Sequence, residues 1–216
     1  MKLLISIHDY SYAAFLKICS YFHKYETTAH SGDLPTVILI PGVYENWFYF
    51  RKIRTYLLKR GYNIINADSL YRSKSIAEDA NALSSYINDN LFENVILVGH
   101  SSGGITALKC LKNNDRIKKV IAIAVPFSGV KNGHFLRTTR VRELLPNSDE
   151  VKDIKLLPTD LLNKVVSIYP TYDNQIWSKS GSLLDSVESI RLKSNGHHLI
   201  LKSDELLDTL SRVIVN

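Results

Sequence analysis

Cysteine, glycine and proline are all scarce in this chain of 216 residues, which contains 2 Cys, 10 Gly and 6 Pro. The two cysteines, Cys19 and Cys110, fall in apolar, helix-like stretches, which excludes a disulfide-dense scaffold and is typical of small buried residues in a reducing compartment. The low glycine and proline content excludes collagen-like and low-complexity chains. With 45% hydrophobic residues, the composition is that of one globular domain over residues 1–216.

Long hydrophobic runs are also missing. The opening stretch has one basic residue, Lys2, and His8 and Asp9 interrupt it before it reaches the length of a signal-peptide core. No apolar stretch approaches the roughly 18 residues that a membrane-spanning helix requires. We therefore expect a soluble, cytoplasmic protein whose contact with membranes is at most peripheral.

Charge is unbalanced but dispersed along the chain. The 27 basic and 21 acidic residues leave a net charge of +6, yet no basic run with interleaved aromatic residues occurs, which disfavours a nucleic-acid partner. We also expect no metal site, because four histidines have no partners at metal-ligand spacing. These are His8, His23, His30 and His134.

Short β-branched runs alternate with helix-like segments from residue 36 onward. This alternation predicts an α/β fold with a doubly wound, mainly parallel six-stranded sheet and helices on both faces. The expected strands cover residues 37–40, 62–66, 94–98, 120–125, 165–169 and 187–192. The expected helices cover residues 47–60, a segment beginning after Ser75, and residues 103–112 and 203–213.

The Gly-His-Ser-Ser-Gly-Gly run at residues 99–104 carries the most chemical information. Gly-x-Ser-x-Gly alone also occurs in ordinary turns. Here an expected strand runs directly into Gly99 and an apolar helix begins near Gly103, which is the context of a nucleophile elbow. A side chain at either glycine would collide with neighbouring backbone in so tight a turn. The pattern therefore predicts that Ser101 is a nucleophile at a helix N-terminus, where the helix dipole favours developing negative charge.

A serine hydroxyl requires a base to accept its proton. The segment Gly196-His197-His198 lies between the last expected strand and the last expected helix, where a base is needed. A polar surface turn is the alternative interpretation. We favour His197 as the base because glycine directly before it allows the turn, and His198 is the alternative.

The imidazole in turn requires a buried carboxylate that holds its tautomer and stabilises its cation. Asp173 supplies one directly after the fifth expected strand. Asp160 and Asp185 compete less well, because they lie where solvated or helix-capping carboxylates are the ordinary interpretation.

The remaining requirement is a pair of backbone donors for an oxyanion. Ser102, the residue after the nucleophile, and Val43, in the loop after the first core strand, meet it by position. Gly42 before Val43 would let that loop turn its amide inward, although Pro41-Gly42 is also a common turn.

With these segments assembled, residues 36–213 resemble the small α/β-hydrolase lipases and esterases of bacteria, especially the compact, nearly lidless lipases. The chain order Ser101, Asp173, His197 is the order of that family. Two features depart from the resemblance: Pro41-Gly42 stands where the family often has His-Gly, and residues 1–34 have no counterpart in the compact group. The resemblance implies an intracellular serine hydrolase that cleaves a small-molecule carboxylic ester through an acyl-enzyme, without a cofactor. A thioesterase with the same triad and a catalytically silent binding protein are the alternatives.

Two segments lie outside the strand and helix alternation. Residues 1–34 form an N-terminal extension with an expected helix at about residues 11–25. Residues 129–163 are positioned to form a small cap over the active site or a solvated surface loop. The second segment is basic and offers a possible peripheral membrane contact through Lys131, Arg137, Arg140 and Arg142.

Overall fold

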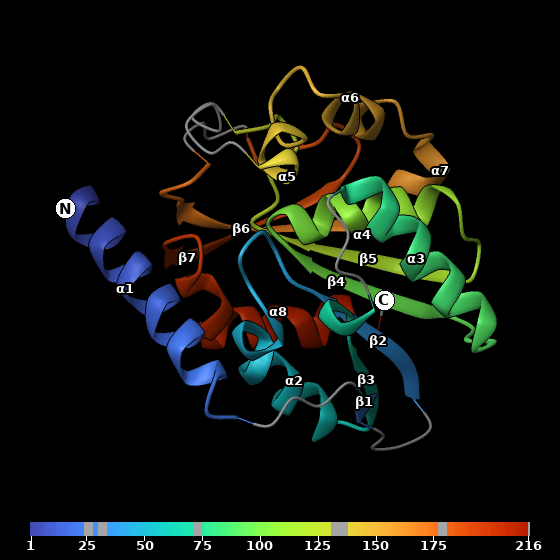
Figure 1. Cartoon of the computed structure of the whole chain (residues 1–216), viewed down its shortest axis with the longest axis horizontal. Coiled ribbons are helices and arrows are strands. Elements are labelled where there is room, and N and C mark those ends of the chain that lie inside the picture. The colour runs from blue at the N-terminus through green and yellow to red at the C-terminus, as the bar shows by residue number, and fades with distance from the viewer. Residues whose placement is uncertain (24–27, 30–33, 71–74, 131–137, 177–180, 216) are drawn as a thin grey trace.

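A seven-stranded sheet forms the centre of the protein in the computed structural model, which describes residues 1–23, 28–29, 34–70, 75–130, 138–176 and 181–215. The strand order is β1-β3-β2-β4-β5-β6-β7, and helices cover both faces (Figure 1). All neighbouring pairs from β3 to β7 are parallel, which confirms the predicted doubly wound sheet of six strands. These six strands are β2 (Leu34–Ile40), β3 (Tyr62–Asn66), β4 (Val95–His100), β5 (Ile117–Ile123), β6 (Val165–Tyr172) and β7 (Glu188–Asn195).

The seventh strand, β1 (Thr28–Ala29), was not predicted and pairs antiparallel with β3 at the edge of the sheet. Other differences concern element ends. The strand predicted to stop at residue 169 continues through Pro170 to Tyr172, with an irregular register between those two residues. The helix predicted for residues 47–60 begins as a 3-10 turn, η1 (Trp47–Phe50), and continues as α2 (Arg51–Leu58).

Strand β2 shows how the sheet builds two cores. Its last four residues are fully buried, and their side chains alternate between the two faces as the period of a strand requires. Val37 and Leu39 join the cluster under α2 and α8 (Asp204–Val213), whereas Ile38 and Ile40 join the cluster under α3 (Ile76–Asp89) and α4 (Ser102–Lys112). Both faces are therefore sealed, as the near-continuous hydrophobic strands predict.

The N-terminal helix α1 (Lys2–Ser20) begins about nine residues earlier than predicted. His8 and Asp9, expected to interrupt the opening apolar run, lie inside it. A carboxylate does not end the helix here because Asp9 is fully buried and hydrogen-bonded to a distant loop. Helix α1 packs along η1 and runs beside the ends of β6 and β7 (Figure 1).

The segment after β5 packs on the domain over its described part and is not a solvated loop. It forms three short helices, α5 (Thr139–Arg142), α6 (Asp149–Lys155) and α7 (Thr159–Leu162), which bury apolar side chains such as Val151 and Ile154. Arg140 forms an ion pair with the buried Asp79 of α3. Lys131 and Arg137 lie outside the described residues, and the function of this segment as a cap stays a prediction.

No helix in the described parts of the chain is long and apolar enough to cross a membrane.

Candidate active site

Ser101 lies in a sharp turn between β4 and α4. Its backbone has φ 53° and ψ −126°, a conformation that residues with a side chain rarely adopt. Two hydrogen bonds hold it there: the Ser101 N–H donates to the Ile123 carbonyl at 3.0 Å, and the Ser101 carbonyl accepts from the Gly104 N–H at 3.1 Å. The surrounding strands therefore stabilise a strained elbow that lifts Ser101 above the end of the sheet.

The glycines around the elbow are required by close backbone contacts. A Cβ atom on Gly99 would lie 2.6 Å from backbone atoms of Gly103, and one on Gly103 would lie 2.1 Å from the carbonyl oxygen of Ile40. The steric reason predicted for these two glycines is thus confirmed. Because Gly99 and Gly103 have no side chains, α4 can begin directly against β2 and β4.

The loops after β6 and β7 bring Asp173 and His197 together. Asp173 Oδ2 accepts a hydrogen bond from His197 Nδ1 at 2.8 Å, and Asp173 Oδ1 accepts from the N–H groups of Gln175 and Ile176, also at 2.8 Å. Burial raises the pKa of Asp173, but the charge of His197 and these hydrogen bonds outweigh it and lower the pKa. The other candidate acids, Asp160 and Asp185, are exposed.

The second imidazole nitrogen, His197 Nε2, is buried and has no hydrogen-bond partner among the described residues. Ser101 Oγ is therefore not hydrogen-bonded to it in this conformation. The two residues are nevertheless held close, because His100, the neighbour of Ser101, donates from Nε2 to the His197 carbonyl at 2.9 Å. Hydrogen bonds of this kind are often long without substrate and shorten in the reacting complex.

A buried ion pair between His100 and Glu45 lies next to the elbow. His100 donates from Nδ1 to Glu45 Oε1 at 2.7 Å, while Glu45 Oε2 accepts from the Gly42 N–H at 2.7 Å. Since both ring nitrogens of His100 face acceptors, His100 is an imidazolium cation. Burial opposes charge on both side chains, but their mutual attraction raises the pKa of His100 and, with the Gly42 N–H, lowers the pKa of Glu45 to about 2.

Sequence reasoning missed a second Asp–His pair, made by Asp9 of α1 and His198. Asp9 Oδ2 accepts from His198 Nδ1 at 2.8 Å and Asp9 Oδ1 accepts from the N–H groups of His198 and Leu199 at 2.7 and 2.9 Å. Asn174 donates to Asp9 Oδ2 at 3.1 Å and accepts from the His197 N–H at 3.0 Å. Helix α1 is thereby tied to both histidines of the loop.

Burial raises the pKa of Asp9, but its hydrogen bonds and the nearby histidine charges outweigh burial and lower the pKa to about 2. Asp9 had one sequence signal, a lone carboxylate within an apolar helix pattern. Glu45 and Asn174 had none, because their importance depends on partners far away in the chain.

The loop after β2 lies against the elbow. A Cβ atom on Gly42 would lie 2.9 Å from the Cβ atom of Ser101, which places Val43 next to the expected nucleophile. Ser102 is the first residue of α4, where backbone N–H groups have no partner within the helix. Both predicted oxyanion donors are thus near Ser101, whereas the N–H of Gly42 is occupied by Glu45.

Three side chains here could offer ligand atoms to a metal ion. Atoms of Glu45, His100 and His197 lie within 4.8 Å of one another. Binding an ion at His100 would break its hydrogen bond to Glu45 or to the His197 carbonyl, so this donor set is already committed to the protein. The expectation that the protein uses no metal stays a prediction.

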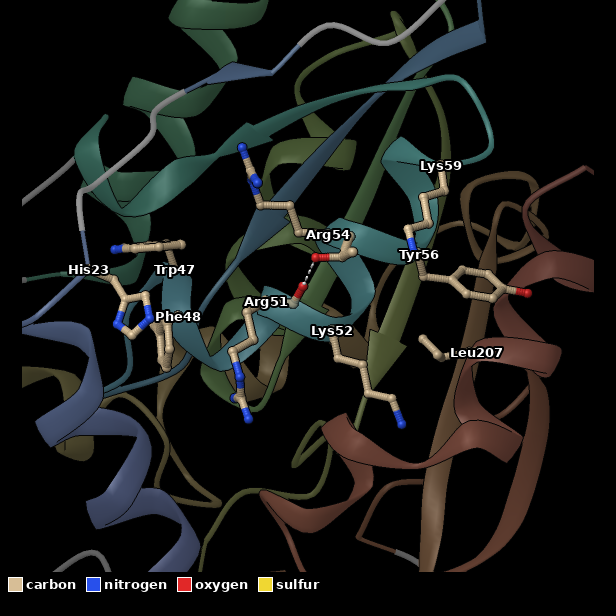
Figure 2. Close-up of a pocket in the computed structure, with 10 residues that line it drawn as sticks. His23, Trp47, Phe48, Arg51, Lys52, Arg54, Tyr56, Lys59 and Leu207 are labelled. Atoms are coloured by element: carbon tan, nitrogen blue, oxygen red, sulfur yellow. Dashed lines mark hydrogen bonds between the residues drawn. The ribbon is translucent and has the colours of Figure 1, made fainter.

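Two hollows lie near these elements. A cavity of about 850 Å³ between the first turns of α1 and the ends of β6 and β7 is lined by Asp173 and Asn174 among others. An open pocket of about 740 Å³ lies on η1 and α2, and Figure 2 shows its aromatic and basic lining. None of the residues predicted to carry chemistry lines this second pocket. It is lined by His23, Trp47, Phe48, Arg51, Lys52, Arg54, Thr55, Tyr56, Lys59 and Leu207.

The lowered pKa values of Asp9 and Glu45 predict loss of stability in acid. A carboxylate whose pKa is lower in the folded than in the unfolded state stabilises the fold above its ordinary pKa, and this contribution is lost as the pH falls. We expect the free energy of unfolding to decrease between pH 4.5 and about 2, by roughly 2 kcal/mol for Asp9 and roughly 3 kcal/mol for Glu45.

Urea unfolding at a series of pH values measures this dependence. Glu45→Gln should lower stability at neutral pH and flatten the acid dependence, whereas an unchanged slope would contradict the role given to Glu45. His100 acts in the opposite direction: its contribution is complete below 6.5, its ordinary pKa, and is lost as the pH rises through its raised value.

Comparison with known proteins places this geometry in a known fold. No protein-family model and no curated protein sequence matches the chain. Solved structures do: an esterase from Exiguobacterium antarcticum (14% identity, TM-score 0.65) and a bromoperoxidase from Bacillus anthracis (16%, 0.64) each match over 88% of this chain and 95% of theirs.

A monoacylglycerol lipase from Paleococcus ferrophilus matches with 18% identity and a TM-score of 0.59, over 88% of this chain and 97% of its own. Identities this low establish architecture and leave activity open. The sheet, the elbow between β4 and α4, and these likenesses identify the chain as a protein of the α/β-hydrolase fold.

Proposed function

We propose that this protein is a serine hydrolase that cleaves carboxylic esters through an acyl-enzyme intermediate. The observation that carries the proposal is the 2.8 Å hydrogen bond between Asp173 and His197 at the same edge of the sheet as the strained elbow of Ser101. A histidine oriented by a carboxylate beside a serine in a strained turn is the arrangement that activates a hydroxyl group.

In the proposed reaction, Ser101 Oγ attacks the ester carbonyl carbon and its proton passes to His197 Nε2. The carbonyl oxygen becomes an oxyanion, which the N–H groups of Val43 and Ser102 stabilise. The bond to the alcohol oxygen then breaks, and His197 returns the proton to this leaving group. Water then attacks the acyl carbon of the acyl-enzyme and gives its proton to His197. The bond between the acyl carbon and Ser101 Oγ breaks, His197 returns the proton to Ser101 Oγ, and the carboxylic acid is released.

The surroundings of the base support this assignment of roles. Asp173 holds the proton of His197 on Nδ1, so that Nε2 faces the reaction as an acceptor. His198 is committed to Asp9 and, at 3.5 Å, to Glu45. The ion pair of His100 and Glu45 holds this arrangement in place, because His100 donates to the His197 carbonyl and Glu45 accepts from the Gly42 N–H.

The names of the similar structures agree with ester hydrolysis at a coarse level, because two of the three are called an esterase and a lipase. A thioester fits the same constellation, since the leaving group is selected by pocket shape. A catalytically silent binding protein would retain the fold without an activated serine. Chemical labelling separates this last alternative from both hydrolases.

The deciding experiment is labelling with a fluorophosphonate probe, which reacts with activated serines. Wild-type protein should be labelled and Ser101→Ala should not. Ser102→Ala is the matched control, because it removes the neighbouring hydroxyl but keeps its backbone N–H, and it should still be labelled. If Ser101→Ala is labelled as strongly as wild type, Ser101 is not the nucleophile. Hydrolysis of p-nitrophenyl esters and thioesters of increasing acyl length then identifies the preferred substrate.

A further inference from the structure

Helix α1 presents an apolar face to solvent. Six large apolar side chains on it are between 52% and 72% exposed, and they recur at helical spacing within a stripe about 140° wide. Single exposed apolar residues are ordinary, but a contiguous stripe indicates an interaction surface. The stripe consists of Leu3, Leu4, Ile7, Tyr10, Phe15 and Ile18, and Tyr21 and Phe22 extend it beyond the helix.

The charges around this stripe are positive. The only carboxylate of α1 is Asp9, which is buried on the opposite side of the helix, while Lys17 lies at the edge of the stripe. Lys2 lies on the same side of the helix as Asp9, with its ammonium group 5.6 Å from the centre of the Tyr172 ring. Arg51 and Lys202 both lie over the ring of Tyr12 of α1, at 5.9 and 4.7 Å from its centre.

More cations follow along α2, next to the end of α1. Figure 2 shows Arg51 and Lys52 on that helix, Lys59 directly after its end, and His23 beside Phe48 at the Arg51 end of the pocket. Lys52 is neutralised by its ion pair with Asp204. Arg51 and Lys59 then account for the positive charge on this side of the molecule. A surface with an apolar centre and cationic margins is complementary to anionic lipid headgroups over an acyl layer.

The stripe is rigidly connected to the candidate active site. The opposite face of α1 holds Asp9 in contact with the His197–His198 loop, and the first turn of α1 lines the cavity that contains Asp173. A surface bound to the stripe would therefore lie beside the carboxyl edge of the sheet.

We propose that α1 docks this protein on the surface of a bilayer that contains anionic phospholipids, with the exposed stripe in the headgroup and upper acyl region. The helix lies in the plane of the surface, since no helix in the described residues could span the bilayer. A second copy of the chain is the competing occupant, and the experiment separates the two.

The test is cosedimentation of the full-length chain with vesicles of phosphatidylcholine and phosphatidylserine in equal parts. The variant combines Leu3→Gln, Ile7→Gln and Phe15→Gln, because glutamine preserves helix propensity and removes the apolar contact. Leu156→Gln is the matched control, since Leu156 is 78% exposed on the far segment after α6. Burying three such side chains predicts a loss of affinity of more than about 100-fold in the triple variant and none in the control.

Several results would overturn the proposal. The proposal fails if the wild-type protein does not bind the mixed vesicles, or if the triple variant binds them as tightly as the wild type. It also fails if the wild type binds vesicles of phosphatidylcholine alone as tightly as the mixed vesicles, at both high and low salt. A wild-type dimer that the triple variant dissociates, without vesicle binding, would assign the stripe to self-association. Thermal unfolding of all three proteins should be the same, because the substituted side chains are exposed. The measurement needs no turnover, so it is independent of the proposed ester hydrolysis.

Discussion

Replacement of His197 by alanine is expected to reduce kcat for a p-nitrophenyl ester by about 10⁴-fold or more, with a much smaller change in KM. His197 is the imidazole that Asp173 orients, and without it the proton of Ser101 has no acceptor in the site. The loss falls on kcat because proton transfer occurs in the transition state and contributes little to substrate binding.

His198→Ala is the discriminating control, because it removes the adjacent imidazole from the same loop. That side chain is bound to Asp9, so we expect lower stability and a loss of kcat of no more than about tenfold. A greater loss for His198→Ala than for His197→Ala would reverse the assignment of the base. Added imidazole should restore part of the activity of His197→Ala if the missing group is the proton acceptor.

Replacement of Asp9 by alanine is expected to lower the free energy of unfolding by about 3–5 kcal/mol. The change leaves four buried donors without their acceptor: Nδ1 and the N–H of His198, the N–H of Leu199 and the amide of Asn174. For a chain of this size, a loss in this range lowers the melting temperature by roughly 10 °C.

Denaturant unfolding and thermal melts measure this effect. Asp9→Asn should recover part of the loss, because its amide oxygen can still accept from the two backbone N–H groups. Asp208→Ala, which removes an exposed carboxylate from α8, should change stability by no more than about 0.5 kcal/mol. If Asp9→Ala is as stable as this control, α1 does not hold the histidine loop.

The fold was largely predictable because it depends on local patterns. Fully apolar, β-branched runs such as Val37 to Ile40 are typical of strands covered on both faces, and the Ser75 cap begins α3 as its spacing with Glu78 predicts. Element ends were less predictable, because they depend on tertiary contacts. The start of α1 shows this, since the carboxylate that would interrupt a free apolar helix is satisfied by the backbone of residues 198 and 199.

The sequence by itself determined the doubly wound sheet and the elbow of Ser101, since short-range sterics and strand-to-helix spacing specify both. It also placed Asp173 and His197 at strand ends that parallel pairing brings to one edge of the sheet. Only the tertiary structure decided which aspartate meets which histidine, and that Glu45 and Asp9 lie beneath the site. Hydrogen bonds between residues up to 190 positions apart leave no periodicity in the chain, so packing alone creates them.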